Sequence, residues 1–225
     1  MWVAGIDVWK RRWATVILRD GRYERAIVAP RIDDLLSELS DMAAIGIDMP
    51  IGLTSGTERR EADAEARKFI GPRGSSVFPT YPREVYAALD YNTARERCLA
   101  LTGGSRSISR QAYALGERVL ELEEAVAVRD DTREVHPEVS FCAMAGRHLA
   151  WTKTSWNGLH ERVRLLRDQQ MVIPAEVTDI GDAGAEDLLD AAAAAWSATR
   201  IANGNALSLP RPPQVANGRQ IAIWY

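Results

Sequence analysis

The tripeptide Gly-Ile-Asp occurs twice in the first fifty residues of this chain, at residues 5–7 and 46–48, and each copy ends a short apolar run. A continuous run of Val, Ile and Ala is typical of a strand that is buried on both faces of a sheet. A carboxylate that ends such a strand marks the point where the sheet opens into a crevice. The repeat therefore predicts two buried strands that each present one acid at their end, Asp7 and Asp48.

The region around this repeat predicts a mixed sheet. Strands are expected at residues 2–8, 13–18, 23–29 and 43–48. The pair Asp20-Gly21, flanked by β-branched and aromatic residues, is the strongest short signal for a hairpin, so the first three strands should form an antiparallel meander. Apolar spacing at residues 32–41 predicts a helix. A helical crossover makes the fourth strand parallel to the first.

The remainder of the chain predicts mainly helices. From about residue 54 to 130 the pattern is one of charged helices, with a long one at about 109–127 and a loop at 70–79 that is too rich in Gly, Pro and Ser for regular structure. We interpret this stretch as a helical insertion within a single domain of residues 1–225. After it we expect a strand at 133–136, helices at about 137–146, 157–169 and 185–202, a proline-rich linker at 210–213 and a strand at 220–224.

A third acid belongs with Asp7 and Asp48. Asp190 lies inside an alanine-rich, apolar helix, where an unpaired charge is costly, so something is expected to share its site. Asp187 lies on the same helix face, although its first-turn position is explained equally well by the helix dipole. Three carboxylates from two strands and a helix suit two divalent cations, Mg²⁺ or Mn²⁺, that promote phosphoryl transfer. The alternative for Asp7 and Asp48 is that each is only a residue of the turn that follows its strand.

The segment from Arg133 to Glu138 contributes further candidates. Glu134 and His136 share a face of the expected strand, and Glu138 falls in the first turn of the next helix. These residues could supply a metal ligand, a general base or a proton shuttle. A helix cap explains Glu138 and His136 equally well.

A nucleic-acid substrate also requires cations that contact phosphate. Lys10 follows Asp7 by three residues and could approach a scissile phosphate. For the arginines, a solvated surface position is the alternative, and the net charge of −3 argues against a strongly basic nucleic-acid binder. The candidates are Lys10, Arg73, Arg83, Arg106 and Arg110.

These motifs resemble known proteins. The strand, hairpin, helix and strand opening and the final Asp-x-x-Asp-Ala helix look like the ribonuclease H-like fold, and residues 187–191 look like the end of RuvC-type Holliday-junction resolvases. More closely, nearly the whole chain resembles the bacterial and archaeal family called domain of unknown function 429, a group predicted to be RNase H-like nucleases. The matching pieces are Gly5-Ile6-Asp7 with Lys10, residues 47–53, 71–78 and 134–141, and Asp190-Ala191.

The resemblance implies an α/β fold with an RNase H-like mixed five-stranded sheet, in which three antiparallel strands precede the parallel ones and helices flank the sheet. It also implies a nuclease-like metal site. Two departures matter for function: Asp48 stands where resolvases have glutamate, and the helical insertion is not part of the common core. The substrate is therefore not implied by the resemblance.

The leading hypothesis is a metal-dependent nuclease that hydrolyses phosphodiester bonds of DNA or RNA. Its expected catalytic residues are Asp7, Asp48, Glu134, His136 and Asp190. Its expected ligands for Mg²⁺ or Mn²⁺ are Asp7, Asp48, Glu138, Asp187 and Asp190. One alternative is an ATPase or kinase of the actin-like fold, although such proteins need glycine-rich phosphate-binding turns in both halves. The other alternative is a non-catalytic nucleic-acid-binding module. The intact acids are evidence against it, because such a module would not need them.

The sequence also bears on location. Cys98 and Cys142 lie among apolar residues in no metal-type spacing, which favours a reducing compartment. The charged residues 10–12 follow too soon for a signal sequence or a membrane span. We expect a cytoplasmic protein with no membrane partner. The oligomeric state stays open, with a homodimer among the alternatives.

Overall fold

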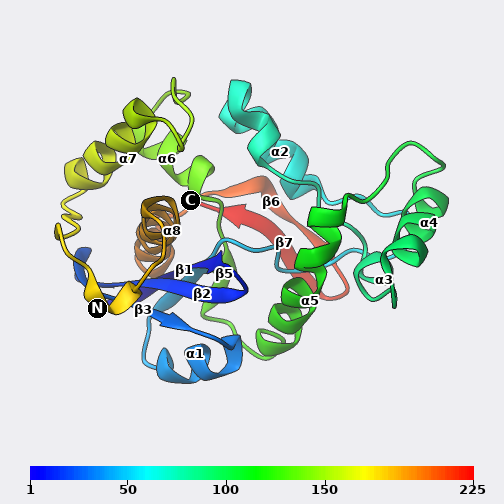
Figure 1. Ribbon diagram of the computed structural model, residues 1–225, viewed down its shortest axis with the longest axis horizontal. Helices are drawn as coiled ribbons and strands as arrows, with labels where there is room; N and C mark the ends of the chain where they lie inside the picture. The colour runs from blue at the N-terminus through cyan, green and yellow to red at the C-terminus, as the bar shows by residue number, and fades with distance from the viewer.

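A five-stranded mixed sheet forms the centre of the protein (Figure 1). The computed structural model describes residues 1–225 and has the strand order β3-β2-β1-β4-β5. Strands β1 to β3 are antiparallel, and β4 and β5 are parallel to β1. The predicted α/β fold, with three antiparallel strands followed by parallel ones, is therefore confirmed. The strands are β1 (Trp2–Trp9), β2 (Arg12–Arg19), β3 (Arg22–Ala29), β4 (Ala44–Ile47) and β5 (Thr132–Glu134).

Two tight turns shape the meander. Asp20 and Gly21 join β2 to β3 with φ angles of 52° and 76°, as the predicted hairpin requires. Lys10 and Arg11 join β1 to β2 with φ angles of 45° and 66°. The second turn contains no glycine or asparagine, so the hairpin signal is missing from its sequence although the geometry is similar.

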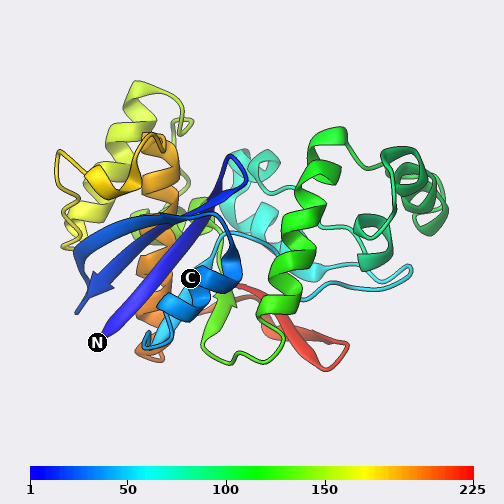
Figure 2. The ribbon, with the colours of Figure 1, turned by 60° about the horizontal axis from the view of Figure 1, so that its bottom comes forward.

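Helices cover both faces of the sheet. They are α1 (Ile32–Glu38), α2 (Glu61–Ile70), α3 (Arg83–Tyr86), α4 (Tyr91–Leu101), α5 (Arg110–Ala125), α6 (Pro137–Ala145), α7 (Trp156–Asp168) and α8 (Ala185–Ala202), with short 3₁₀ helices η1 (Gly71–Ser76) and η2 (Thr178–Ile180). Figures 1 and 2 show α3 to α5 on one side of the molecule and α6 to α8 on the other. The prediction of an irregular loop at 70–79 was wrong in one respect, because most of this stretch forms the 3₁₀ helix η1. A short 3₁₀ helix tolerates Pro72 near its start.

The alternation of side chains along the strands places one hydrophobic cluster on each face of the central sheet, and a third cluster lies between α2, α6 and the carboxy-terminal strands. Ile6 of β1 belongs to a cluster that includes Leu35 of α1 and Val119 of α5. Val3, on the opposite face of β1, belongs to a cluster formed mainly with the alanines of α8 and with Phe141 of α6. Of the helices between β4 and β5, α3, α4 and α5 therefore share a core with the central sheet, whereas α2 packs in the separate cluster with the carboxy-terminal strands. No helix in the protein is both long enough and apolar enough to cross a bilayer.

The carboxy-terminal segment corrects one prediction. Residues 210–213, predicted as a proline-rich linker, lie within β6 (Ser208–Ala216), which pairs with β7 (Arg219–Trp224). The ladder tolerates the prolines because it skips them: Leu209 pairs with Ile223, and the next pair is Gln214 with Ile221. A bridge between Val135 and Trp224 attaches this hairpin beside β5.

Candidate functional site

The two Gly-Ile-Asp copies lie side by side in the sheet. Gly5 pairs with Gly46, and Ile6 pairs with Ile47, in the parallel ladder between β1 and β4. The ladder continues one step further, since the backbone N–H of Asp48 donates to the carbonyl of Ile6 at 2.8 Å. Because side chains alternate along a strand, the two glycines and the two aspartates all face α8.

The glycines let α8 rest directly on the two strands. A Cβ atom on Gly5 would lie 2.0 Å from the backbone nitrogen of Ala195 and 2.2 Å from the carbonyl oxygen of Ala191. On Gly46 it would lie 2.6 Å from the carbonyl oxygen of Ala194. The backbone of α8 occupies the space that side chains would otherwise fill. This close packing sets the depth of the helix and so the position of Asp190, which precedes these alanines.

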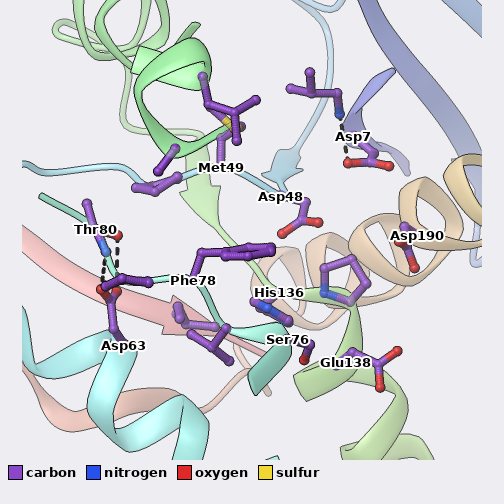
Figure 3. Close-up of a pocket in the computed structure, with 18 of the residues that line it drawn as sticks. Asp7, Asp48, Met49, Asp63, Ser76, Phe78, Thr80, His136, Glu138 and Asp190 are labelled. Atoms are coloured by element: carbon purple, nitrogen blue, oxygen red, sulfur yellow. Dashed lines mark hydrogen bonds between the residues drawn. The ribbon is translucent and has the colours of Figure 1, made fainter. Parts of the chain in front are cut away.

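The three aspartates line one cavity of about 580 Å³ at the ends of the parallel strands (Figure 3). Asp7 comes from β1, Asp48 follows β4 and Asp190 comes from α8. The opposite walls come from the segment around η1 and from α5. The other lining residues with acidic, basic or imidazole side chains are Asp63, Arg73, Glu134, His136, Glu138 and Lys153.

Burial and mutual repulsion disfavour charge on these aspartates. Burial and the neighbouring carboxylates of Asp48 and Asp190 raise the pKa of Asp7, and burial with the charge of Asp190 raises the pKa of Asp48. Burial raises the pKa of Asp190 to about 6, although the charge of Lys153 opposes this shift. Groups with such shifts cluster at functional sites, because an arrangement of like charges that costs stability is retained where chemistry needs it.

Lys153 shares the site of Asp190, and no pattern in the sequence identified it. Its Nζ lies 2.5 Å from Asp190 Oδ2. Burial opposes charge on Lys153, but Asp190 and the other aspartates raise its pKa above the ordinary value. Lys153 comes from the loop between α6 and α7, which has no periodic pattern. No sequence signal links that loop to the sheet.

The donor set of the cavity fits a hard divalent cation. All candidate ligands are oxygens from three separate elements, as Mg²⁺ and Mn²⁺ prefer. Asp190 Oδ1 is buried without a hydrogen-bond partner. In the arrangement described, no three His, Cys, Asp or Glu side chains converge on one point that could hold a metal ion. Ligation by all three aspartates therefore requires side-chain rotation.

Glu134 is held in a buried ionic network. Both of its carboxylate oxygens accept hydrogen bonds from Arg60, and Oε2 also accepts from the backbone N–H of Ile51 at 2.8 Å. Arg60 also donates to Asp63 at 2.7 Å, and Asp63 accepts from the N–H of Thr80 at 2.6 Å. With its oxygens engaged, Glu134 positions the segment after Asp48. Burial raises the pKa of Glu134 to about 7, although the charge of Arg60 opposes this shift, and its catalytic role stays a prediction.

His136 and Glu138 lie at the start of α6. The strand predicted at 133–136 ends earlier, at Glu134, and His136 is the N-cap residue of α6. His136 Nδ1 is buried without a partner, and burial lowers the pKa of the ring, so the imidazole is neutral at pH 7. Glu138 Oε1 accepts from the buried Arg162 at 2.5 Å. Glu138 therefore lines the cavity with one oxygen already paired.

The remaining predicted residues lie mostly outside the cavity. Asp187 does not join the aspartates, because its carboxylate accepts from the N–H of Gly184 at 2.9 Å and caps α8. Among the predicted phosphate contacts, only Arg73 lines the cavity. Arg83 pairs with Glu124 at 3.6 Å, and Arg110 lies over the ring of Tyr91. Lys10 and Arg106 are exposed and lie outside the lining.

Cation binding at this site is expected to release protons and to weaken as the pH falls. The pKa of Asp190 is raised to about 6 and those of Asp7 and Asp48 are also raised, so part of the aspartate set holds protons that it must lose to bind a cation. Calorimetric titration with Mn²⁺ at about pH 6, in two buffers of different ionisation enthalpy, measures the protons released. The Asp7→Asn variant should release fewer protons than the wild type when it binds Mn²⁺. An affinity that stays constant between about pH 5 and 7 would contradict this assignment.

Comparison with known proteins identifies a family. The family model described as "Protein of unknown function (DUF429)" matches residues 5–215. Searches of curated proteins and of solved structures gave no match.

Proposed function

Because the chain belongs to the DUF429 family, whose description assigns no activity, we propose a function from the geometry of the site: a divalent-metal-dependent nuclease that hydrolyses phosphodiester bonds of DNA or RNA. The observation that carries this proposal is the meeting of Asp7, Asp48 and Asp190 in one cavity. A sheet with three antiparallel strands followed by parallel ones, which the resemblance to ribonuclease H-like proteins implied, supports it.

The three aspartates are the proposed ligands of Mg²⁺ or Mn²⁺. When bound, such cations polarise phosphoryl oxygens and lower the pKa of water. The protein contributes a rigid frame, because two in-register strands and a helix packed on their glycines hold the acids. With the backbone of the site already in place, only side chains must rotate to complete ligation, which limits the reorganisation that the reaction requires.

Two further residues have proposed roles beside the aspartates. Lys153, once released from Asp190, carries a positive charge that can bind a phosphate oxygen in the cavity. His136 presents a neutral imidazole to the same cavity and can carry a proton to or from the reacting oxygens. Arg73 adds a second cation at the wall of the cavity.

The test is a cleavage panel over single-stranded, duplex, hybrid and branched substrates with Mg²⁺ or Mn²⁺. We expect Asp7→Asn to lower the rate by at least about 100-fold, because several kcal/mol of charge stabilisation depend on the metal and each 1.36 kcal/mol is tenfold. Asp187→Asn is the matched control: its amide oxygen can still cap α8, and it should cleave at the wild-type rate.

Two outcomes would reject the proposal. Equal cleavage by the wild type and by Asp7→Asn would exclude the aspartate site as the source of activity. Metal-dependent hydrolysis of ATP without cleavage of any nucleic acid would favour the ATPase or kinase alternative.

A further inference from the structure

Two exposed aromatic side chains border the acidic site. Phe78 lines the main cavity and is 63% exposed (Figure 3). Trp156 is 75% exposed and lines a second cavity of about 430 Å³. The two cavities adjoin, because Lys153 and Thr154 line both. A large apolar ring in water costs free energy, so two such rings beside one polar site call for a ligand with apolar faces.

The position of Phe78 is fixed by its neighbours. Before it, the carbonyl of Val77 accepts hydrogen bonds from Arg67 at 2.8 and 3.0 Å. After it, the N–H of Thr80 donates to the buried Asp63 at 2.6 Å. The backbone is thus anchored on both sides of Phe78, and the ring is held in the cavity wall.

Trp156 is also supported. It is the first residue of α7, whose N-cap Ser155 accepts from the N–H of Gly158. His160, one turn later, lies against the tryptophan ring with centroids 4.0 Å apart. One ring face is therefore partly covered, while most of the side chain stays open to the second cavity.

A hydrogen bond ties the two aromatic segments together. Arg73, in η1 and close to Phe78 in the chain, donates to the carbonyl of Ala150 at 2.8 Å. Ala150 belongs to the loop that leads through Lys153 to Trp156. Lys153 lies between the two cavities and is paired with Asp190. The order along this surface is thus an aromatic ring, a cation next to the acids, and a second aromatic ring.

We propose that the site takes unpaired nucleotides of a single strand, with one base stacked on Phe78, another on Trp156, and the phosphate between them near the aspartates and Lys153. This inference rests on the proposed nuclease function and names its substrate class. Base stacking on aromatic side chains is the general way in which proteins hold single strands. A duplex cannot bind in this way, because neighbouring base pairs cover the faces of its bases.

The experiment measures binding by fluorescence anisotropy, with Asp7→Asn as the parent protein so that cleavage is disabled. The ligands are a labelled single strand, its duplex and an abasic strand of equal length, with Mg²⁺ present. We expect Phe78→Ala and Trp156→Ala each to weaken single-strand binding about tenfold, within the range for loss of one stacked base. Neither change should alter binding of the abasic strand, which keeps the phosphates but has no bases.

Two control variants accompany these changes. Phe78→Tyr keeps the ring and should keep the affinity. Leu89→Ala removes a side chain that is 98% exposed and outside both cavities, so it should leave binding unchanged. Thermal melting of every variant checks that the fold is intact.

The outcomes separate this inference from the nuclease proposal. Equal affinity for single strand and duplex, or equal losses on the abasic strand, would overturn the stacking inference even if the wild type cleaves nucleic acid. Ring-dependent binding of single strands by a wild type that cleaves nothing would support stacking while rejecting the nuclease.

Discussion

Gly5→Ala is expected to lower the free energy of unfolding by more than about 3 kcal/mol, the upper end for overpacking a core. The added Cβ would lie 2.0 Å from the nitrogen of Ala195, whereas real Cβ contacts are essentially never below 3.0 Å. A long side chain can rotate away from such a contact, but the obstacle here is the backbone of α8. The helix must move off β1, and Asp190 must move with it.

Urea denaturation followed by circular dichroism measures this effect, and the expected result is a lower midpoint with an unchanged slope. Gly184→Ala is the control, because its Cβ would meet only the flexible carboxylate end of Asp187, at 2.9 Å. That change should cost less than about 1 kcal/mol. A stability equal to wild type for Gly5→Ala would show that α8 does not rest on the strand as described.

Arg60→Ala is expected to cost about 3 to 5 kcal/mol, the usual effect of removing one partner from a buried ionic group. Arg60 is buried, donates to Glu134 and Asp63, and also donates to the carbonyls of Ile51 and Gly52. Its loss leaves two carboxylates buried without their cation and two carbonyl groups without a donor. The segment that follows Asp48 would lose its anchor at the same time.

The cost of Arg60→Ala should depend on pH in a defined direction. Burial already raises the pKa of Glu134 to about 7 in the folded protein while the charge of Arg60 opposes the shift, so loss of the guanidinium raises this pKa further above that of the unfolded chain. A carboxyl group with a raised folded pKa favours folding at low pH, and this contribution is lost as the pH rises through that pKa. Unfolding of the variant should therefore be easier at about pH 8 than at about pH 5, relative to wild type.

Arg83→Ala provides the comparison on the surface. Its ion pair with Glu124 is open to solvent, with the Arg83 side chain 46% exposed, and such pairs contribute at most about 1 kcal/mol. If Arg60→Ala cost no more than Arg83→Ala, the buried network would not be the anchor inferred for the strand ends.

Much of the fold followed from local patterns in the chain. Alternation and burial identified the five strands, and the helix at 185–202 was predicted with the bounds found for α8. These predictions succeeded because periodicities of 2 and 3.6 residues record which side chains are buried. The prediction of a linker at 210–213 failed because pairing in β6 skips residues. The turn at Lys10 and Arg11 lacks the usual hairpin residues, but the antiparallel pairing across it was predicted from the flanking strands and is confirmed.

The aspartates at the strand ends were predictable because a carboxylate that ends a buried run has few other reasons to be there. The glycines of the Gly-Ile-Asp repeat also allow α8 to pack closely, because they lie where the backbone of the helix contacts the strands. The cations that neutralise the buried acids were not predictable. Arg60 and Lys153 lie outside the strands, and nothing in the sequence around them distinguishes them from ordinary surface residues.

The chain's own pattern of burial thus indicated the strands, the flanking helices and the aspartates that end the buried runs, because each of these signals comes from neighbours a few residues away. The pairings of Lys153 with Asp190 and of Arg60 with Glu134 join residues 37 and 74 positions apart. Such contacts depend on where loops without periodicity come to lie against the sheet. For the same reason Arg73 alone among the predicted arginines lines the cavity, and Phe78 and Trp156 border the acids only once the chain has folded.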